Sequence, residues 1–103
     1  MNMNKIYQID EIKEKLQPVF SSAPVYQAIL FGSYAKGEAS EKSDVDILID
    51  SRGLLVNINF FGLLEDITSA LDKTVDMFEI SDIREGSPIA ISIQEQGVVL
   101  FER

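Results

Sequence analysis

The feature that most constrains the fold is an apolar run that stops at a Gly-Ser pair and resumes as a segment with one acidic face. Residues 25–31, VYQAILF, are rich in β-branched and aromatic side chains and end at Gly32 and Ser33. Over residues 44–50, acidic and aliphatic side chains alternate. Because successive side chains of a strand point to opposite faces, this alternation predicts a strand that is packed on its aliphatic side. The two segments therefore predict a pair of strands joined by a turn.

Two longer segments have helical periodicity. A helix is expected over residues 7–20, with Pro18 as its weakest point and an early end there as the alternative. A second helix is expected over residues 59–72, where apolar side chains form one stripe and Asn59 is the expected N-cap.

Further strands and a short helix complete the expected fold. Strands are expected over residues 74–80 and 97–102, and between them Ser87 and Pro88 are typical of the N-cap and first turn of a helix. This order predicts a single domain over residues 1–103 with an α/β (α+β) fold. In this fold a mixed four-stranded sheet is covered by helices mainly on one face.

Composition narrows the class of protein. The chain carries 9 basic and 17 acidic side chains, and its net charge of −8 repels a phosphate backbone, so direct nucleic-acid binding is not expected. Histidine and cysteine are absent, which leaves carboxylates as the expected catalytic and metal-binding groups. No stretch approaches the ~18 apolar residues of a membrane span, and the N-terminus is charged where a signal peptide is apolar. We therefore expect a cytoplasmic protein without membrane contact.

Acidic side chains gather on the expected sheet. Asp44 and Asp46 are two positions apart, so they project from the same face of their strand. A divalent cation relieves the repulsion between adjacent carboxylates, and Mg²⁺ typically takes one or two of them together with phosphate oxygens and water. Asp76 lies in an apolar strand, where an unpaired carboxylate is costly to bury. If the strands are neighbours, the three acids form a triangle able to hold two cations, as in phosphoryl-group chemistry.

The Gly-Ser pair is a candidate binding site for phosphates. A strand that ends at Gly32 and leads into a short helical segment exposes backbone N–H groups that can hold phosphate oxygens. Ser33 adds a hydroxyl donor, Lys36 offers a positive charge, and Gly37 lets the chain turn back toward the second strand. Together with the acids, this turn predicts a site for a nucleotide and its metal ions.

The pattern of Gly32 and Ser33, ten residues, and then Asp44-x-Asp46 resembles the signature of the nucleotidyltransferase fold shared with DNA polymerase beta. The whole chain resembles the minimal nucleotidyltransferase (MNT) branch of that family. The resemblance implies transfer of a nucleoside monophosphate from an NTP, usually ATP, to a hydroxyl group with release of pyrophosphate. It also implies that the Gly-Ser pair binds the triphosphate, that Asp44 and Asp46 hold two Mg²⁺ ions, and that Asp76 is the third carboxylate, near the acceptor.

Members of this branch are often the antitoxin half of a HEPN/MNT pair, and some transfer AMP to a tyrosine of the HEPN ribonuclease. The resemblance therefore implies a HEPN-type toxin as the partner of this chain and a tyrosine as the acceptor. An antitoxin that neutralises its partner by occlusion, without catalysis, is the alternative. Nucleotide transfer to a small molecule such as an aminoglycoside is a weaker one.

The candidate residues also have interpretations that involve no ligand. Asp44 and Asp46 are compatible with a solvated strand face, and the Gly-Ser pair with an ordinary loop. Asp76 competes for its role with Glu79, which alternation places on the opposite face of the third strand. The apolar cluster at residues 60–64 is expected to pack in the core, with a surface that faces a partner as the alternative.

Overall fold

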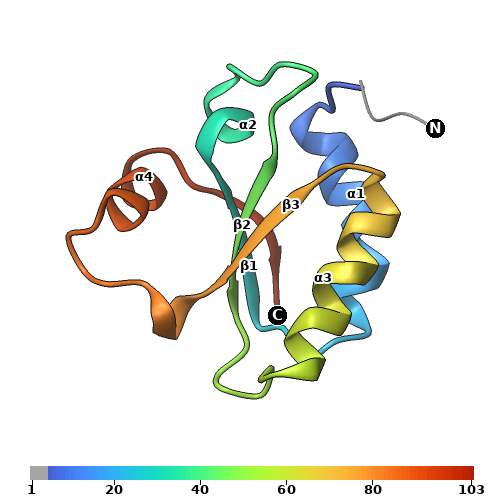
Figure 1. Cartoon of the computed structure of the whole chain (residues 1–103), viewed down its shortest axis with the longest axis vertical. Helices are drawn as coiled ribbons and strands as arrows, with labels where there is room; N and C mark the ends of the chain where they lie inside the picture. Colours follow the sequence, from blue (N-terminus) through green and yellow to red (C-terminus); the bar gives the residue numbers. More distant parts are fainter. Residues whose placement is uncertain (1–4) are drawn as a thin grey trace.

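A four-stranded sheet lies at the centre of the molecule, with helices packed against it (Figure 1). The structure is a computed structural model that describes residues 5–103. Along the chain the elements are α1 (Ile9–Ser21), β1 (Gln27–Phe31), α2 (Gly32–Lys36), β2 (Val45–Asp50), α3 (Ile58–Leu71), β3 (Val75–Glu79), η1 (Ile80–Asp82), α4 (Pro88–Gln96) and β4 (Val98–Glu102). The expected order of strands and helices is confirmed, and η1 is added to it.

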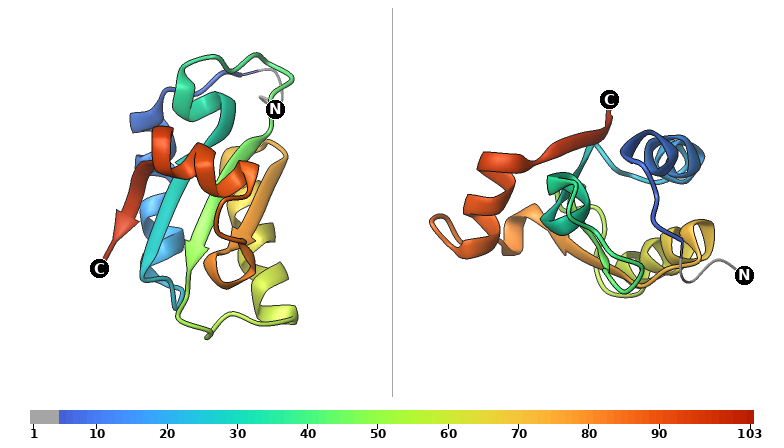
Figure 2. Two further views of the ribbon diagram at one scale, coloured as in Figure 1. Left: turned by 90° about the vertical axis from the view of Figure 1, so that its left-hand side faces the viewer. Right: turned by 90° about the horizontal axis from the view of Figure 1, so that it is seen from above.

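The sheet is mixed, as expected. Its strand order is β3-β2-β1-β4, with β1 antiparallel to both of its neighbours and β2 parallel to β3. The two long helices, α1 and α3, cover one face, whereas the short α4 lies on the other side of the sheet, against β1 (Figure 2). The face of the sheet opposite α1 and α3 therefore has no long helix over it among the described residues.

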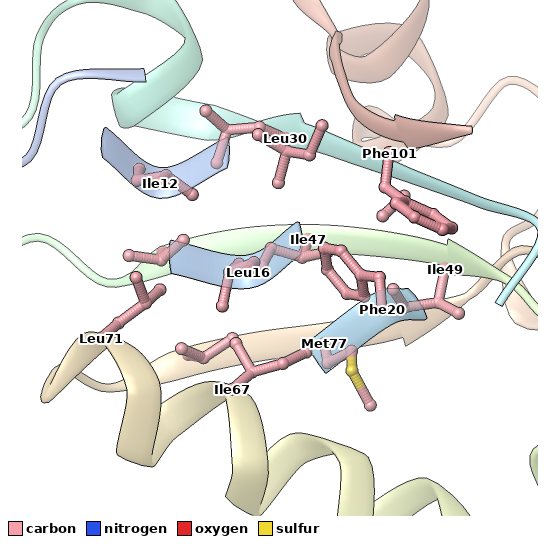
Figure 3. Packing of buried hydrophobic residues seen from close by; sticks show 14 of the residues in the cluster. Ile12, Leu16, Phe20, Leu30, Ile47, Ile49, Ile67, Leu71, Met77 and Phe101 are labelled. Carbon is pink, nitrogen blue, oxygen red and sulfur yellow. The ribbon is translucent and has the colours of Figure 1, made fainter. Parts of the chain in front are cut away.

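The core lies between the sheet and the two long helices (Figure 3). Every second side chain of a strand points into this core, and the others point to the opposite face of the sheet. The rings of Phe20 and Phe101 pack with their centres 5.6 Å apart, so that α1 is held against β4. Side chains with no exposed surface include Ile12, Leu16, Phe20, Leu30, Ile47, Ile49, Ile67 and Leu71. This packing makes the sheet a rigid platform for the groups on its other face.

Pro18 does not end α1, so the early end considered above is wrong. The helix continues to Ser21, and its last carbonyl groups find donors far away in the sequence. The guanidinium group of Arg103 donates hydrogen bonds to the carbonyl oxygens of Phe20 (3.1 Å), Ser21 (3.1 Å) and Ala23 (2.8 Å). A cation at a helix C-terminus also interacts favourably with the helix dipole. The C-terminal residue thereby stabilises the last turn of α1.

The N-cap of α3 is Asn57, which corrects the expected Asn59. Asn57 has a positive φ of 51°, and its carbonyl oxygen accepts hydrogen bonds from the N–H groups of Phe60 and Phe61. The helix therefore begins at Ile58, earlier than the periodicity of its apolar side chains indicates.

The apolar cluster at residues 60–64 is divided between core and surface. Leu63 is buried and Phe60 and Leu64 pack partly against the core, whereas 65% of Phe61 is exposed. Core packing is therefore confirmed for most of the cluster but not for Phe61.

The predicted N-cap of α4 is confirmed. The hydroxyl of Ser87 accepts a hydrogen bond from the N–H of Ala90 (3.2 Å).

Within residues 5–103, every helix is too short or too polar to cross a membrane. The inference from the charged N-terminus rests partly on residues 1–4, which lie outside the described residues. Cytoplasmic location and the extent of the domain over residues 1–103 stay predictions.

Candidate active site

The sheet brings the acids of two strands together. In the parallel pairing of β2 and β3, Asp46 lies beside Asp76, and on the other side of β2 it faces Phe31 of β1. The condition that the two acidic strands be neighbours is therefore met. The side chain of Ile47, next along β2, is fully buried in the core, so Asp46 points to the face away from the long helices.

Gly32 lies directly against this carboxylate. Its φ is +72°, and a Cβ atom added there would stand 2.1 Å from Oδ2 of Asp46, less than any real contact allows. A glycine is therefore required for two reasons: the left-handed backbone and the close approach of the carboxylate. The turn after β1 and the acidic strand form one site, as the spacing in the sequence predicts.

The carboxyl group of Asp46 has a pKa raised from 3.8 to about 6. Burial is the main cause, followed by the negative charges of Asp76 and Asp44 and by a hydrogen bond to the side chain of Asp76. Asp46 is half-buried, whereas Asp44, just before β2, and Asp76 are exposed. Like charges thus converge on one carboxylate, an arrangement that a bound cation would stabilise.

The raised pKa of Asp46 predicts how stability depends on pH without metal. Between about pH 4 and 6 the folded chain holds a proton on Asp46 that the unfolded chain has released, so this contribution to stability falls as the pH rises through that window. We expect the free energy of unfolding of Asp46→Asn, minus that of the wild type, to rise between pH 4 and 6.5. Urea titrations without Mg²⁺ measure it, and a difference that is constant with pH would contradict the assignment.

The carboxylates suit a hard cation that shares its ligands with phosphate. Within residues 5–103 no three His, Cys, Asp or Glu side chains are grouped so that they could hold a metal ion on their own. Asp46 and Asp76 do meet, and Mg²⁺ usually takes only one or two carboxylates and completes its octahedron with phosphate oxygens and water. The pair therefore fits Mg²⁺ that arrives with a nucleotide, and the roles of Asp44, Asp46 and Asp76 as metal ligands stay predictions.

The expected phosphate donors lie at the start of α2, next to the acids. The first N–H groups of a helix have no acceptor within it. In α2 these groups lie in the turn that begins with Gly32 and the half-buried Ser33. Gly37 ends the helix with φ +74°, and the N–H of Glu38 returns to the carbonyl oxygen of Ser33 (2.9 Å). Lys36 is exposed at the other end of α2, about 6 Å along its axis from Gly32. Of Gly32, Ser33 and Lys36, Lys36 therefore lies farthest from the expected phosphate site.

A pair of aromatic rings on the face of the sheet that carries the acids was not among the predicted site features. The rings of Phe31 and Phe78 pack with their centres 5.8 Å apart. Phe31 comes directly before Gly32, and Phe78 comes two positions after Asp76. Phe31 is buried and is the residue of β1 that pairs with Asp46, whose pKa is raised mainly by burial. Alternation along β3 puts Phe78 on the face of Asp76, whereas the position of Phe31 beside Asp46 depends on the pairing of β1 with β2.

A mixed sheet with a Gly-Ser turn beside paired carboxylates defines the class of enzymes that transfer nucleotidyl groups. The chain belongs to the family described as Polymerase beta, Nucleotidyltransferase, which matches residues 14–103. The chain is thus a nucleotidyltransferase, and the resemblance seen in the sequence is confirmed.

Individual relatives are consistent with this class. The protein adenylyltransferase MntA of Shewanella oneidensis is 35% identical over 91 residues, which are 86% of this chain and 56% of that protein. This chain therefore spans a little over half the length of that relative. A chain in a crystal structure of a toxin-antitoxin with AMP-PNP is 26% identical with a TM-score of 0.72, over 88% of this chain and 73% of the other.

The fold recurs in a further complex. The structure of a tri-AMPylated Shewanella oneidensis HEPN toxin in complex with an MNT antitoxin contains a chain that is 23% identical with a TM-score of 0.67. The match covers 92% of this chain and 73% of that one. At this identity the likeness shows a shared fold.

Proposed function

We propose that this protein transfers AMP from ATP to a hydroxyl group of a partner protein, in a reaction that depends on Mg²⁺. The observation that carries the proposal is the meeting of Asp46 with Asp76 across β2 and β3, against the turn at Gly32. In the reaction the acceptor oxygen forms a bond to the α-phosphorus of ATP, the bond from that phosphorus to the bridging oxygen breaks, and pyrophosphate leaves. The hydroxyl proton passes to a base.

Each residue of the site has a role in this scheme. Asp44 and Asp46 would hold two Mg²⁺ ions together with Asp76, and the ions would neutralise charge on the phosphates and lower the pKa of the acceptor hydroxyl. Asp76, on the edge strand β3 and exposed, orients the acceptor hydroxyl and takes its proton. The N–H groups at the start of α2 and the hydroxyl of Ser33 bind the triphosphate. Lys36 adds positive charge near its tail.

The proposed partner is a HEPN-type toxin, and the proposed acceptor is one of its tyrosines. The resemblance to the MNT branch supports this, and so do the relative named protein adenylyltransferase and the toxin-antitoxin structure with AMP-PNP. Modification of the toxin would make this chain an antitoxin that acts by catalysis.

A transfer assay tests the proposal directly. The purified chain is incubated with α-labelled ATP, Mg²⁺ and a candidate HEPN-type partner protein. We expect label on the partner, its loss without Mg²⁺, and its loss in the double variant Asp44→Ala, Asp46→Ala. Absence of label with the wild type, or equal labelling by the double variant, would overturn the proposal. A double variant that still neutralises the toxin in cells would indicate occlusion.

A further inference from the structure

The end of the sheet away from α2 carries exposed apolar side chains. They belong to the loop between β2 and α3 and to the first turns of α3, which Figure 1 shows at the end of the molecule opposite α2. The exposed fraction is 55% for Leu54 and Val56, 81% for Ile58 and 65% for Phe61. Single exposed apolar residues are ordinary, but four within eight positions give this end of the molecule an apolar surface of the kind that marks an interaction site.

A pocket opens beside this apolar surface, between the start of α3 and η1. It has a volume of about 320 Å³, and Val56, Phe60 and Phe61 line one side while Glu79 and Asp82 line the other. The rings of the two phenylalanines meet edge to face, with their centres 5.9 Å apart. We call this feature the Phe61 pocket. Its walls combine aromatic faces with carboxylates.

Glu79 gives the pocket a buried negative charge. Only 6% of its surface is exposed, and its two carboxylate oxygens accept hydrogen bonds from the N–H (3.1 Å) and the hydroxyl (3.0 Å) of Ser51. These neutral donors occupy one lone pair on each oxygen, and a carboxylate can accept about four hydrogen bonds. A second acid, Asp82, is exposed at the rim. The bonds to Ser51 therefore hold Glu79 in place at the wall of the pocket, where its carboxylate adds to the negative charge of Asp82.

No lysine or arginine within residues 5–103 lines the Phe61 pocket. Arg52, in the adjoining loop, has its guanidinium group stacked 4.0 Å from the centre of the Tyr26 ring. An arginine or lysine from another molecule fits this pocket as the missing positive charge. Its apolar stem packs on aromatic rings, and its charged end pairs with carboxylates. The flanking apolar surface suits apolar neighbours of that basic residue.

The negative charge of the chain favours a basic partner protein over a second copy of the chain as the occupant of the pocket. The chain has a net charge of −8, and a symmetric dimer through this face would place the acids of one copy near the same acids of the other. Like charges across an interface oppose association. A basic partner protein is favoured over a second copy.

We propose that the Phe61 pocket and the apolar surface beside it form the docking surface for the acceptor protein, which inserts an arginine or lysine flanked by apolar side chains. This inference rests on the proposed function for the identity of the partner. Glu79 and Asp76 are both on β3, three residues or about 10 Å apart, and β3 is an edge strand. A partner anchored at the pocket can therefore reach the carboxylates around the open edge of the sheet.

Binding measurements with matched variants test the docking surface. The probe is the same HEPN-type protein that is used in the transfer assay, and its Kd for this chain is measured by titration calorimetry. We expect Phe61→Asp to raise Kd at least about tenfold, as changes at central interface residues do. Asp82→Lys should also raise Kd, because it replaces attraction for a basic side chain by repulsion. The control Val99→Asp places the same charge on β4 at the opposite edge, on a residue that is 43% exposed, and should leave Kd within about twofold.

The salt dependence supplies an independent readout. Wild-type binding should weaken as the salt concentration rises, and Asp82→Lys should reduce that dependence, because it removes an attractive charge. Circular dichroism confirms that each variant is folded, which the exposure of Phe61 and Asp82 leads us to expect.

The outcomes separate this inference from the proposed function. If the wild type labels and binds the partner while both pocket variants bind with unchanged Kd, the docking surface is wrong and the function stands. If the wild type binds but transfers no label, the function is wrong, and the Kd series still decides the pocket. Absence of binding by the wild type, or a dimer of the chain alone that Phe61→Asp dissociates, overturns the docking proposal.

Discussion

Asp46→Asn is expected to lower the rate of AMP transfer by about 10³-fold while the domain stays folded. The substitution keeps the size of the side chain but removes the charge that faces Asp76 beside Gly32, and with it a ligand for the proposed Mg²⁺ ions. Loss of one preorganised electrostatic group typically costs about 10²–10³ in rate, and a metal ligand acts on both the attacking and the leaving group. The measurement is single-turnover transfer of labelled AMP at saturating ATP and Mg²⁺.

Asp50→Asn is the matched control, because Asp50 lies on the same face of β2, four residues further along. Its Oδ1 accepts a hydrogen bond from the N–H of Arg52 (3.0 Å), which the amide oxygen of asparagine can also accept. We expect nearly wild-type transfer by this variant. Equal losses in Asp46→Asn and Asp50→Asn would indicate a general effect of charge, and transfer by Asp46→Asn above a tenth of the wild-type rate would exclude an essential role.

Gly32→Ala is expected to reduce transfer by about 100-fold or more. The new Cβ would stand 2.1 Å from Oδ2 of Asp46, so either the carboxylate or the turn must move away from its place in the site. The φ of +72° adds strain for alanine of about 1–2 kcal/mol. A displacement of about 1 Å in a reacting constellation is enough to cost about 100-fold in rate.

Gly37→Ala separates these two effects. Gly37 has nearly the same φ, +74°, but an added Cβ would have no atom within 4 Å. Its substitution should lower the free energy of unfolding by about 1 kcal/mol and leave transfer within about threefold of the wild type. Urea titration and the single-turnover assay measure both quantities. If the two alanine variants lose activity equally, backbone strain rather than contact with Asp46 explains the loss.

The two ends of the molecule have different proposed tasks. In these two proposals the acids beside Gly32 carry the chemistry, and the pocket at Phe61 binds the protein that brings the acceptor hydroxyl. Such a division suits a domain in which the described residues leave the edge strand β3 open to a partner. The Phe61 and Asp46 variants should therefore affect different quantities, Kd in the first case and the rate of the bound complex in the second.

Much of the candidate site could be predicted because its signals are local. The alternation in residues 44–50 assigns Asp46 to the face opposite Ile47 whatever the sheet looks like. Helix α3 was found from its apolar stripe, but its first residue was not, because Asn57 caps it through a positive φ that periodicity cannot reveal. The expected end of α1 near Ser21 is confirmed, but the sequence alone left an early end at Pro18 open, because the donor for the last carbonyl groups is Arg103, more than 80 residues away.

The amino-acid sequence by itself determined the order of strands and helices, the acidic face of β2 and the Gly-Ser turn, because each depends on side chains that are neighbours along the chain. Only the tertiary structure decided that Asp46 meets Asp76, that Gly32 leaves no room for a Cβ beside it, and that Glu79 is buried at a pocket under Phe61. These contacts join residues up to 30 positions apart, from Asp46 to Asp76. Strand pairing and helix packing decide them, and neither is a property of a local stretch of sequence.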